Sequence, residues 1–312
     1  MPIQVVVLGS GSAVPTLQRN PSAHWLRIHD CDMLIDCGEG TQLQMTRLQL
    51  RSAKLRAIFI SHLHGDHYLG LPGLISSMHL MGRKAPLQLF GPPPLIELLE
   101  QQFKASESFI NFPIEFNPLF ADEPRYIGAF EHFTVQSFPL NHRIACTGFR
   151  FDEKPGLRNI RKDAIKQYQL PVEQLHGIRQ GNDFITPSGK RIPNKEITKA
   201  SKHLASYAYC SDTSPDPAYI QTIQQVDCLY HEATFAENLV GRARDTFHST
   251  AAEAALTALT ARAGHLLIGH FSARYRDVAP LLAEAREIFP NTHAAIDGMA
   301  LEIHSDKHLI IS

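Results

Sequence analysis

Short apolar runs alternate with longer amphipathic stretches along most of the chain. The short runs are rich in Val, Ile, Leu and Phe and are closed by Gly, Pro, Asp or Ser, a pattern typical of strands. They cover residues 3–8, 25–28, 33–35, 55–60, 133–138, 148–151, 206–210, 226–230 and 266–268. The longer stretches predict helices over residues 68–81, 94–104, 250–262 and 278–289. Strands mixed with helices throughout favour a layered α/β architecture.

Two of these helices carry sequence signals for their first turn. A GPPP break precedes the helix at residues 94–104, and proline is favoured at the first position of a helix. Ser249 and Thr250 stand at the start of the helix at residues 250–262, with Glu253 placed to complete a capping box. Both helices are therefore expected to begin at these positions.

Between residues 153 and 202 the periodic pattern disappears. The segment is polar and holds seven Lys and four Arg against five acidic residues, a local charge of +6. Because the whole chain has a net charge of −1, the remainder carries −7. A basic segment that protrudes from an otherwise acidic protein is suited to binding a phosphate backbone. The alternative is a solvated, flexible loop.

Composition limits the class of protein. The chain of 312 residues is 44% hydrophobic, which is enough for a substantial core in one large domain or two lobes. Lys and Arg (30) nearly balance Asp and Glu (31), so there is no overall attraction to nucleic acid or to an acidic membrane. Five scattered cysteines without a CxxC pair favour free thiols in a reducing cytoplasm. The sequence shows neither a signal peptide nor an apolar stretch long enough to cross a bilayer, so no membrane partner is expected.

The stretch FISHLHGDHYLG carries the strongest chemical signal. Directly after an apolar run it places His62, His64, Asp66 and His67. His62 and His64 are two residues apart, so in an extended segment their side chains leave on the same side. Asp66 and His67 are neighbours, and the side chains of neighbours in a non-helical loop usually diverge. Four ligand-type side chains that point in two directions suit two metal ions better than one.

Further ligands are expected where other strands end on the same edge of the sheet. The candidates are His142 after FTVQSFPLN, Asp212 after SYAYCS and His270 after HLLIG. All the candidates are imidazoles or carboxylates, which suit zinc, with manganese or iron as alternatives. The competing interpretation is a polar turn in a chain that holds 17 histidines. Three other histidines also lie near strand ends, namely His132, His203 and His231.

The chain resembles the metallo-β-lactamase superfamily, whose HxHxDH loop it contains, and more closely the ribonuclease Z family of tRNA 3′-processing endonucleases. The likeness covers nearly the whole chain. It includes LGSGSAVPTLQRNPS, LIDCGEGTQLQ, SHLHGDHYLG, PLNH, CSDT, HEATF, FHST and GHFSARY. The HxHxDH loop alone indicates the superfamily, whereas HEATF, HST and SARY together indicate the ribonuclease Z family.

This resemblance implies a fold and a set of metal ligands. The fold is a four-layer αββα sandwich, with two sheets face to face, helices outside and the metals at one edge. A single catalytic domain spans residues 1–312, with an arm inserted at residues 153–202. The resemblance also implies two zinc ions per chain. One would be held by His62, His64 and His142, the other by Asp66, His67 and His270, with Asp212 bridging them.

The same resemblance implies roles in proton transfer. Two cations about 3.5–4 Å apart activate a water and clamp a phosphoryl oxygen, but the departing 3′ oxygen still needs a proton. Glu232 in HEATF and His248 in FHST suit a carboxylate that orients a histidine acting as general acid. The alternative for His248 is a residue at a helix N-terminus with no chemical role. In the family Asp66 also accepts the proton of the attacking water, and the alternative is that it is a ligand only.

Residues near the rim of the site are candidates for binding RNA. Arg19 and Asn20 match the family's RN, and Arg274 in SARY is placed to bind a phosphate beside Ser272. The alternatives are ordinary surface residues or, for Ser272, a helix cap. LGSGSAV resembles half of a dinucleotide fingerprint, but the third glycine is missing and Pro15 prevents the expected helix. It predicts a tight loop at the rim instead.

In the ribonuclease Z family a protruding tRNA-binding arm is inserted where this chain has its basic segment. Arg158, Lys162 and Lys166 are therefore candidate contacts to the tRNA body. Many arms of the family contain a Gly-Pro pair near the tip, whereas LPVEQLHGIRQG has none. The detailed contacts of this arm are left open by that difference.

The implied function is a zinc-dependent phosphodiesterase that removes the 3′ trailer from precursor tRNA and leaves a 3′-hydroxyl, acting as a cytoplasmic homodimer. One alternative is another dinuclear hydrolase of the superfamily, such as a lactonase, thioesterase or arylsulfatase. The basic arm and His248 argue against it. A second alternative is an RNA-binding protein that contains zinc but has no catalytic activity. The complete set of ligands argues against it.

Overall fold

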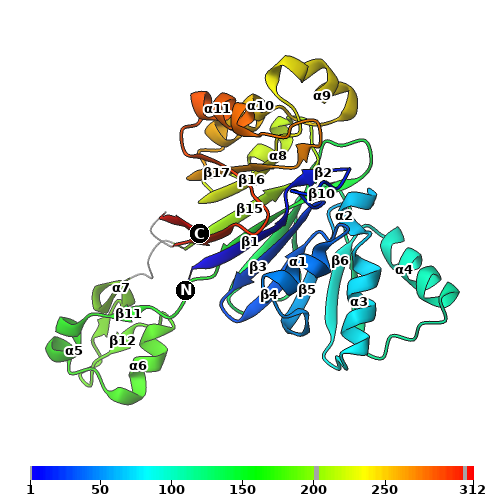
Figure 1. Cartoon of the computed structure of the whole chain (residues 1–312). Helices are drawn as coiled ribbons and strands as arrows, with labels where there is room; N and C mark the ends of the chain where they lie inside the picture. The colour runs from blue at the N-terminus through cyan, green and yellow to red at the C-terminus, as the bar shows by residue number, and fades with distance from the viewer. Residues whose placement is uncertain (1, 200–203, 305–307) are drawn as a thin grey trace.

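Two large sheets packed face to face form the body of the protein (Figure 1). The computed structural model describes residues 2–199, 204–304 and 308–312. The first sheet has eight strands in the order β21 (Leu309–Ile311), β20 (Ala300–Ile303), β1 (Ile3–Gly9), β3 (Ala23–Ile28), β4 (Cys31–Ile35), β5 (Leu55–Phe59), β6 (Leu87–Gly91) and β7 (Ile114–Pro118). The second has seven in the order β19 (Thr292–Ala294), β17 (His265–Gly269), β16 (Cys228–Glu232), β15 (Ser206–Cys210), β10 (Cys146–Glu153), β9 (Phe133–Leu140) and β8 (Arg125–Ile127).

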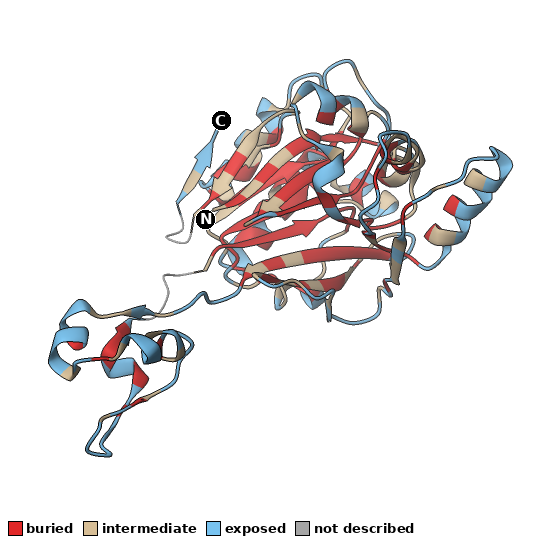
Figure 2. Cartoon of the chain, turned by 90° about the horizontal axis from the view of Figure 1, so that it is seen from below, coloured by how far each residue is buried: buried red, intermediate tan, exposed pale blue. Residues whose placement is uncertain are grey.

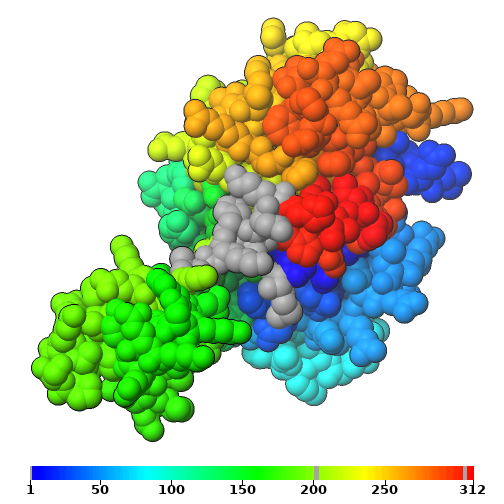
Figure 3. Space-filling model, turned by 90° about the vertical axis from the view of Figure 1, so that its left-hand side faces the viewer, coloured from blue at the N-terminus to red at the C-terminus, as the bar shows by residue number. Residues whose placement is uncertain are grey.

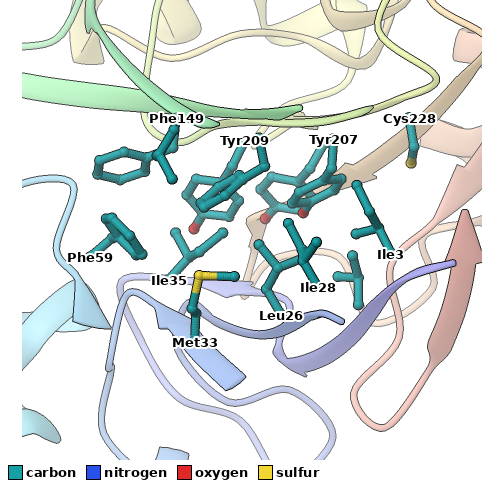
Figure 4. Close-up of a cluster of buried hydrophobic side chains, with 14 of the residues drawn as sticks. Ile3, Leu26, Ile28, Met33, Ile35, Phe59, Phe149, Tyr207, Tyr209 and Cys228 are labelled. Carbon is teal, nitrogen blue, oxygen red and sulfur yellow. The ribbon is translucent and has the colours of Figure 1, made fainter. Parts of the chain in front are cut away.

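The central core lies between the two sheets. Because successive side chains of a strand point to opposite faces, Tyr207 and Tyr209 of β15 point inward while Ala208 packs on the outer side. Figure 4 shows this core, where the ring of Phe59 from β5 lies 5.4 Å from that of Phe149 on β10, measured between centroids. Strands buried on both faces have nearly continuous apolar sequences, as the runs in this chain do.

Helices cover the outer face of each sheet. On the first sheet lie α1 (Thr41–Arg47), α3 (Leu71–Leu80) and α4 (Pro94–Ala105), which pack Met45, Leu74 and Leu95 into a cluster with Trp25 and Ile58. On the second lie α8 (Pro217–Ile220), α10 (Ala251–Thr260) and α11 (Ala279–Ile288), with buried side chains from all three in one apolar cluster. The predicted four-layer αββα sandwich is therefore confirmed.

The predicted helix starts differ in how well they agree with the structure. The α10 helix begins at the predicted capping box, in which the Thr250 hydroxyl accepts from the Glu253 amide and the Glu253 carboxylate accepts from the Thr250 amide. The helix expected over residues 68–81 corresponds to α3 but begins three residues later, because Tyr68 ends a separate short helix, α2 (Gly65–Tyr68). Gly70 lies at the break, where a Cβ would be 2.2 Å from the carbonyl oxygen of Gly38. This close approach requires glycine, and the Gly70 amide donates to the Cys37 carbonyl (2.9 Å) and not to the preceding helical turn.

The described part of the arm, residues 153–199, forms a lobe that stands away from the sandwich (Figures 1 and 3). Residues 200–202 of the predicted arm lie outside the described residues. The lobe contains β11 (Asn159–Ile160), α5 (Lys162–Tyr168), α6 (Val172–Arg179), β12 (Phe184–Ile185), β13 (Arg191–Ile192), α7 (Asn194–Ile197) and β14 (Thr198–Lys199). The polar sequence pattern did not predict these elements.

The arm has a small core and a fixed attachment. Most of its surface is exposed, but a few buried positions are visible in Figure 2. The core consists of Ala164, Leu170, Ile178, Phe184, Ile192 and Ile197. At the base, the Glu153 amide donates to the Ala205 carbonyl (3.0 Å), and the Ala205 amide donates to the Glu153 carboxylate (2.9 Å). The chain therefore leaves and re-enters the sandwich at neighbouring positions.

Within the described ranges, no helix combines the length and apolar character needed to cross a membrane.

Candidate metal centre and acid–base pair

Strand ends from both sheets meet at one edge of the sandwich. The residues there are His62 after β5, His142 after β9, Asp212 after β15, Glu232 at the end of β16 and His270 after β17. Parallel pairing places the C-terminal ends of β15, β16 and β17 side by side. Side chains that are far apart in the sequence are thereby brought to one place.

Three histidines converge in a first group, defined as His62, His64 and His142. The Nε2 atoms of His62 and His142 each lie 3.1 Å from His64 Nδ1. His62 is fully buried, whereas His64 and His142 border the solvent. The side chains of His62 and His64 therefore leave on the same side, as their spacing predicted.

A second group consists of Asp66, His67 and His270. Asp66 Oδ2 lies 3.4 Å from His67 Nε2 and 3.3 Å from His270 Nε2. The expectation that neighbouring Asp66 and His67 diverge was wrong, because both belong to the helical turn α2 and not to an irregular loop. His270 has a backbone φ of 56°, in the left-handed region, which directs the chain away from β17 directly after Gly269.

Asp212 lies between the two groups with one carboxylate oxygen towards each. Its Oδ2 is 3.7 Å from His62 Nε2 and 3.8 Å from His142 Nε2. Its Oδ1 is 3.3 Å from His67 Nε2 and 3.2 Å from His270 Nε2. This is the arrangement that a bridging carboxylate requires.

The spacing of the donor atoms fits metal binding. Tetrahedral coordination with Zn–N bonds of about 2.0–2.1 Å separates adjacent ligand atoms by roughly 3.3 Å. The separations within the groups and to Asp212 run from 3.1 to 3.8 Å, close to that value. His67 Nε2 is also buried without a hydrogen-bond partner, although it faces two carboxylates. A cation at this position would satisfy both the nitrogen and the carboxylates.

The ring nitrogens that face away from the groups are held by neighbouring polar atoms. The Nδ1 atom of His67 lies 2.8 Å from Asp36 Oδ2, and that of His142 lies 3.0 Å from the carbonyl oxygen of Phe247. These acceptors place the ring hydrogen on Nδ1 and leave Nε2 free to bind a metal. His62 and His270 show the same arrangement, with the hydroxyls of Ser61 and Thr234 at 3.0 Å from Nδ1.

The electrostatic environment also favours a cation. Burial lowers the pKa of all three histidines in the first group, so they prefer the neutral form that binds metals. Burial would likewise lower the pKa of His67, but the carboxylates of Asp212, Asp66 and Asp36 outweigh it and raise that pKa well above its ordinary value. Three carboxylates surround the His67 ring and make its environment strongly negative. A bound metal ion would neutralise this charge.

Glu232 and His248 form an ion pair beside the two groups. Glu232 is fully buried, and its Oε1 lies 2.7 Å from His248 Nδ1. Burial alone would lower the pKa of His248, but the charge of Glu232 and this hydrogen bond raise it to about 9. The helix that follows is capped by Thr250, as the alternative for His248 expected, and His248 has the ion pair with Glu232 in addition. The imidazole is therefore protonated at neutral pH and can donate a proton.

Both groups and His248 open into one cavity of about 400 Å³. Its lining includes His64, Asp66, His142, Asp212 and His248, together with Ser12 and Ala13 of the rim loop. A reacting phosphate in this cavity would reach the ligand groups and the proton donor at the same time.

The rim residues Arg19 and Asn20 are engaged within the protein. Only 9% of Arg19 is exposed, and its guanidinium donates to the carbonyl of Tyr275. The backbone and side-chain amides of Asn20 donate to Asp297 Oδ2 at 2.7 and 2.9 Å. These contacts anchor the rim loop, and a direct contact of either side chain with RNA stays a prediction.

Ser272 and Arg274 lie at the outer border of the site. Ser272 is in β18 (Phe271–Ser272), which pairs with β2 (Gly11–Ser12), and its hydroxyl accepts from Arg274 Nε at 2.9 Å. The exposed guanidinium of Arg274 lies 5.0 Å from the ring centroid of Phe235, which in turn is 6.1 Å from the His248 ring. Arg274 is therefore close enough to the proton donor to contact the same substrate.

The three predicted arm residues differ in their surroundings. Lys162 and Lys166 of α5 are exposed. Arg158 is half-buried and donates from Nε to the Thr198 hydroxyl (2.7 Å) across the base of the lobe. The two lysines are thus free to meet a phosphate backbone, whereas Arg158 stabilises the arm.

Of the competing histidines, His132 and His231 lie outside the two groups. The ring of His132 contacts that of His29, with centroids 4.5 Å apart, at a hollow of about 560 Å³ near the opposite ends of the strands. His231 is buried, with Nε2 3.0 Å from the Tyr219 hydroxyl. His203 lies outside the described residues.

Several polar residues of the site were not predicted from the sequence. Asp36, Ser61 and Thr234 support metal-group histidines, and Asp297 anchors the rim loop. Asp36 and Thr234 stand within LIDCGEGT and HEATF, so those stretches contained a signal, but only the structure shows their partners.

Comparisons with known proteins agree with this geometry. A family model described as Anti-Pycsar protein Apyc1 matches residues 3–153. A curated relative, Ribonuclease Z from Parabacteroides distasonis, is 43% identical over 297 residues, which cover 95% of this chain and 98% of the relative.

Two solved structures share the architecture. The crystal structure of the short form of human tRNase Z matches with a TM-score of 0.69 at 26% identity and covers 95% of this chain and 98% of its own. The metallo-β-lactamase fold protein YhfI from Bacillus subtilis matches with a TM-score of 0.68 at 20% identity over 97% of this chain and 100% of its own. The second likeness concerns the fold alone.

Proposed function

The chain belongs to the ribonuclease Z family, and from this membership and the geometry of its site we propose that it is a metal-dependent endoribonuclease that removes the 3′ trailer from precursor tRNA. The observation that carries this function is the Glu232–His248 pair, whose imidazole lines the same cavity as residues of both ligand groups. A ribose 3′ oxygen is a poor leaving group and needs a proton donor beside the metals.

Two zinc ions would fit the seven ligands of the site. His62, His64 and His142 would hold one, Asp66, His67 and His270 the other, and Asp212 would bridge them. The separate oxygens that Asp212 presents to the two groups support this assignment. When bound, the two ions would activate a water and polarise the scissile phosphate.

The chain's own residues would move the two protons of the reaction. Asp66 is held in place because the Ala13 amide donates to its Oδ2 at 2.8 Å, and it would accept a proton from the attacking water. As the water oxygen bonds to phosphorus and the bond to the 3′ oxygen breaks, His248 would donate its Nε2 proton to that oxygen. Glu232 holds Nδ1 and stabilises the protonated ring. The products would be a tRNA with a 3′-hydroxyl and a trailer with a 5′-phosphate.

The arm would bind the body of the tRNA away from the site. Its charge of +6 contrasts with −7 for the rest of the chain, and Lys162 and Lys166 are exposed on its α5 helix. Lysine side chains of this kind bind the phosphate backbone without regard to sequence and fix the position of the substrate on the protein.

The position of the arm supports a homodimer. The arm lies on one side of the sandwich, whereas β2 and α2, which border the site, lie on the other (Figure 1). An arm that binds the same tRNA as a site would therefore serve the site of a second copy. Mixing arm-deleted chains with metal-dead chains tests this, because only a dimer that shares its parts would recover cleavage.

All five cysteines are free and buried, which supports the reducing cytoplasm as the compartment.

Two other functions of the same fold predict different products. A lactonase, thioesterase or arylsulfatase would turn over its small ester without cutting RNA, and a silent RNA-binding protein would do neither. The test is to count metals per chain and to offer the metal-loaded protein a precursor tRNA and a thioester. Trailer removal without thioester turnover supports the proposal, and thioester turnover without RNA cleavage contradicts it.

A further inference from the structure

The hydroxyl of Thr234 lies between the second ligand group and the acid–base pair. Thr234 is 3% exposed, and its Oγ1 is 2.6 Å from Glu232 Oε2 and 3.0 Å from His270 Nδ1. Its hydroxyl therefore contacts both a predicted ligand histidine and the carboxylate that pairs with the proton donor. One side chain thus touches both functional parts of the site.

The hydrogens of these contacts have one consistent direction. His270 faces Asp66 and Asp212 with Nε2, so the ring hydrogen resides on Nδ1 and is donated to Thr234 Oγ1. The Thr234 hydroxyl has a single hydrogen, which goes to the carboxylate oxygen at 2.6 Å in preference to the His270 carbonyl at 3.0 Å. Glu232 in turn accepts from His248 through its other oxygen.

Each oxygen of the Glu232 carboxylate accepts two hydrogen bonds, which fix its orientation. Its Oε1 accepts from the Thr213 amide at 2.9 Å and from His248 at 2.7 Å. Its Oε2 accepts from the Thr234 amide at 3.1 Å and from the Thr234 hydroxyl at 2.6 Å. The hydroxyl gives the shorter of the two contacts to Oε2, so it contributes most to fixing that end of the carboxylate.

We propose that Thr234 is a positioning residue that fixes Glu232 against His248 and couples this proton donor to the ligand His270. The proposal rests on the proposed function, since it assigns His248 the role of general acid. Thr234 itself touches no substrate and acts through Glu232. Replacing its hydroxyl with a methyl group would leave His270 Nδ1–H without its acceptor and Glu232 Oε2 without its closest donor. Contacts of this kind behind a metal ligand are typically worth 10- to 100-fold in affinity or activity.

The test compares Thr234→Val, which keeps the shape of the side chain, with Thr234→Ser, which keeps the hydroxyl. Thr292→Val is the matched control, because Thr292 is also buried and its hydroxyl donates to the Phe289 carbonyl, outside the site. Each zinc-loaded variant is assayed with precursor tRNA and with a nitrophenyl phosphodiester, whose leaving group needs little protonation. Zinc content is measured on the same samples.

We expect Thr234→Val to lose roughly 10- to 100-fold in kcat on precursor tRNA, with little change in KM and a smaller loss on the nitrophenyl substrate. Thr234→Ser should restore most of the rate, and Thr292→Val should match the wild type. Equal losses on both substrates, no loss, or a serine variant no better than the valine variant would each overturn the proposal.

A double-mutant cycle provides a second measurement. In a His248→Ala background the proton donor is absent. Adding Thr234→Val to that variant should therefore lower the cleavage rate of precursor tRNA by less than about threefold. A full additional loss in that background contradicts action through His248. If Thr234→Val does not fold, Thr234→Ala and Thr234→Ser carry the same comparison. A wild type that is fully zinc-loaded yet leaves precursor tRNA uncut refutes the proposed function, whereas normal cleavage by Thr234→Val refutes only this inference.

Discussion

Glu232 Oε1 lies 2.7 Å from His248 Nδ1, with the carboxylate fully buried and the imidazole facing the cavity. An ionised carboxylate in this position offsets the cost of burying a charged imidazole. The pair accounts for a histidine that keeps its proton at neutral pH beside metal ligands that must lose theirs.

Replacing Glu232 with glutamine should shift the alkaline limb of the pH–rate profile to lower pH. His248 donates only when protonated, so activity is present below its pKa, about 9 in this structure, and is lost as the pH rises through it. Burial lowers that pKa and the charge of Glu232 is the largest influence that raises it, so the pKa falls when Glu232 becomes neutral. The measurement is kcat/KM for precursor tRNA against pH. An unchanged alkaline limb in Glu232→Gln contradicts the assignment.

Replacing His248 with alanine should slow the chemical step on RNA by roughly 10²- to 10⁴-fold, the usual contribution of general acid catalysis. A nitrophenyl phosphodiester should lose much less, because its leaving group departs without a proton. Metal content should stay at the wild-type value, which serves as the control. Equal losses on the two substrates would remove His248 from this role.

Replacing Asp212 should disturb the metals more than replacing His270. Asp212 faces both ligand groups with separate oxygens, whereas His270 belongs to one group. Metal analysis of purified Asp212→Ala and His270→Ala decides the point. We expect the lower metal content in Asp212→Ala, and full content in that variant is incompatible with a bridging role.

Removing the arm should weaken the binding of tRNA and leave the site assembled. Glu153 and Ala205 are hydrogen-bonded to each other, so a short Gly/Ser linker can replace the residues between them. Hydrolysis of a small phosphodiester should survive, while the affinity for precursor tRNA falls and its salt dependence flattens by about one unit of slope for each lost phosphate contact.

A milder variant distinguishes the effect of the arm's charge from an effect on the folding of the arm. Lys162→Glu with Lys166→Glu changes exposed residues and should give a weaker form of the same effect. Arg158 is a poor choice for this purpose, because its contact with Thr198 stabilises the lobe. If the arm-deleted protein binds precursor tRNA with unchanged affinity and slope, the arm has no part in substrate binding.

The positions of the predicted ligands follow from local sequence. His142 and Asp212 stand directly after apolar runs, and a buried strand that ends in a polar residue marks the edge of a sheet. The structure places β9 and β15 within two residues of the predicted ends. The capping box at Thr250 and Glu253 is equally local, since its partners are three residues apart.

Other features depend on partners that the sequence does not reveal. The amides of Asn20 donate to Asp297, which is 277 residues further along the chain, and no local pattern indicates this partner. The α5 and α6 helices of the arm have seven and eight residues, too few to produce a clear helical period. Thr234 looks like any threonine after a strand until Glu232, His248 and His270 surround it.

The most direct test of the account is to map the ends produced from a precursor tRNA by the metal-loaded protein. We predict one cut at the start of the 3′ trailer, a 3′-hydroxyl on the tRNA and a 5′-phosphate on the trailer, with cleavage abolished by a chelator and strongly reduced in His248→Ala. A 2′,3′-cyclic phosphate on the tRNA, or no cut at the trailer by a fully metal-loaded chain, would contradict it.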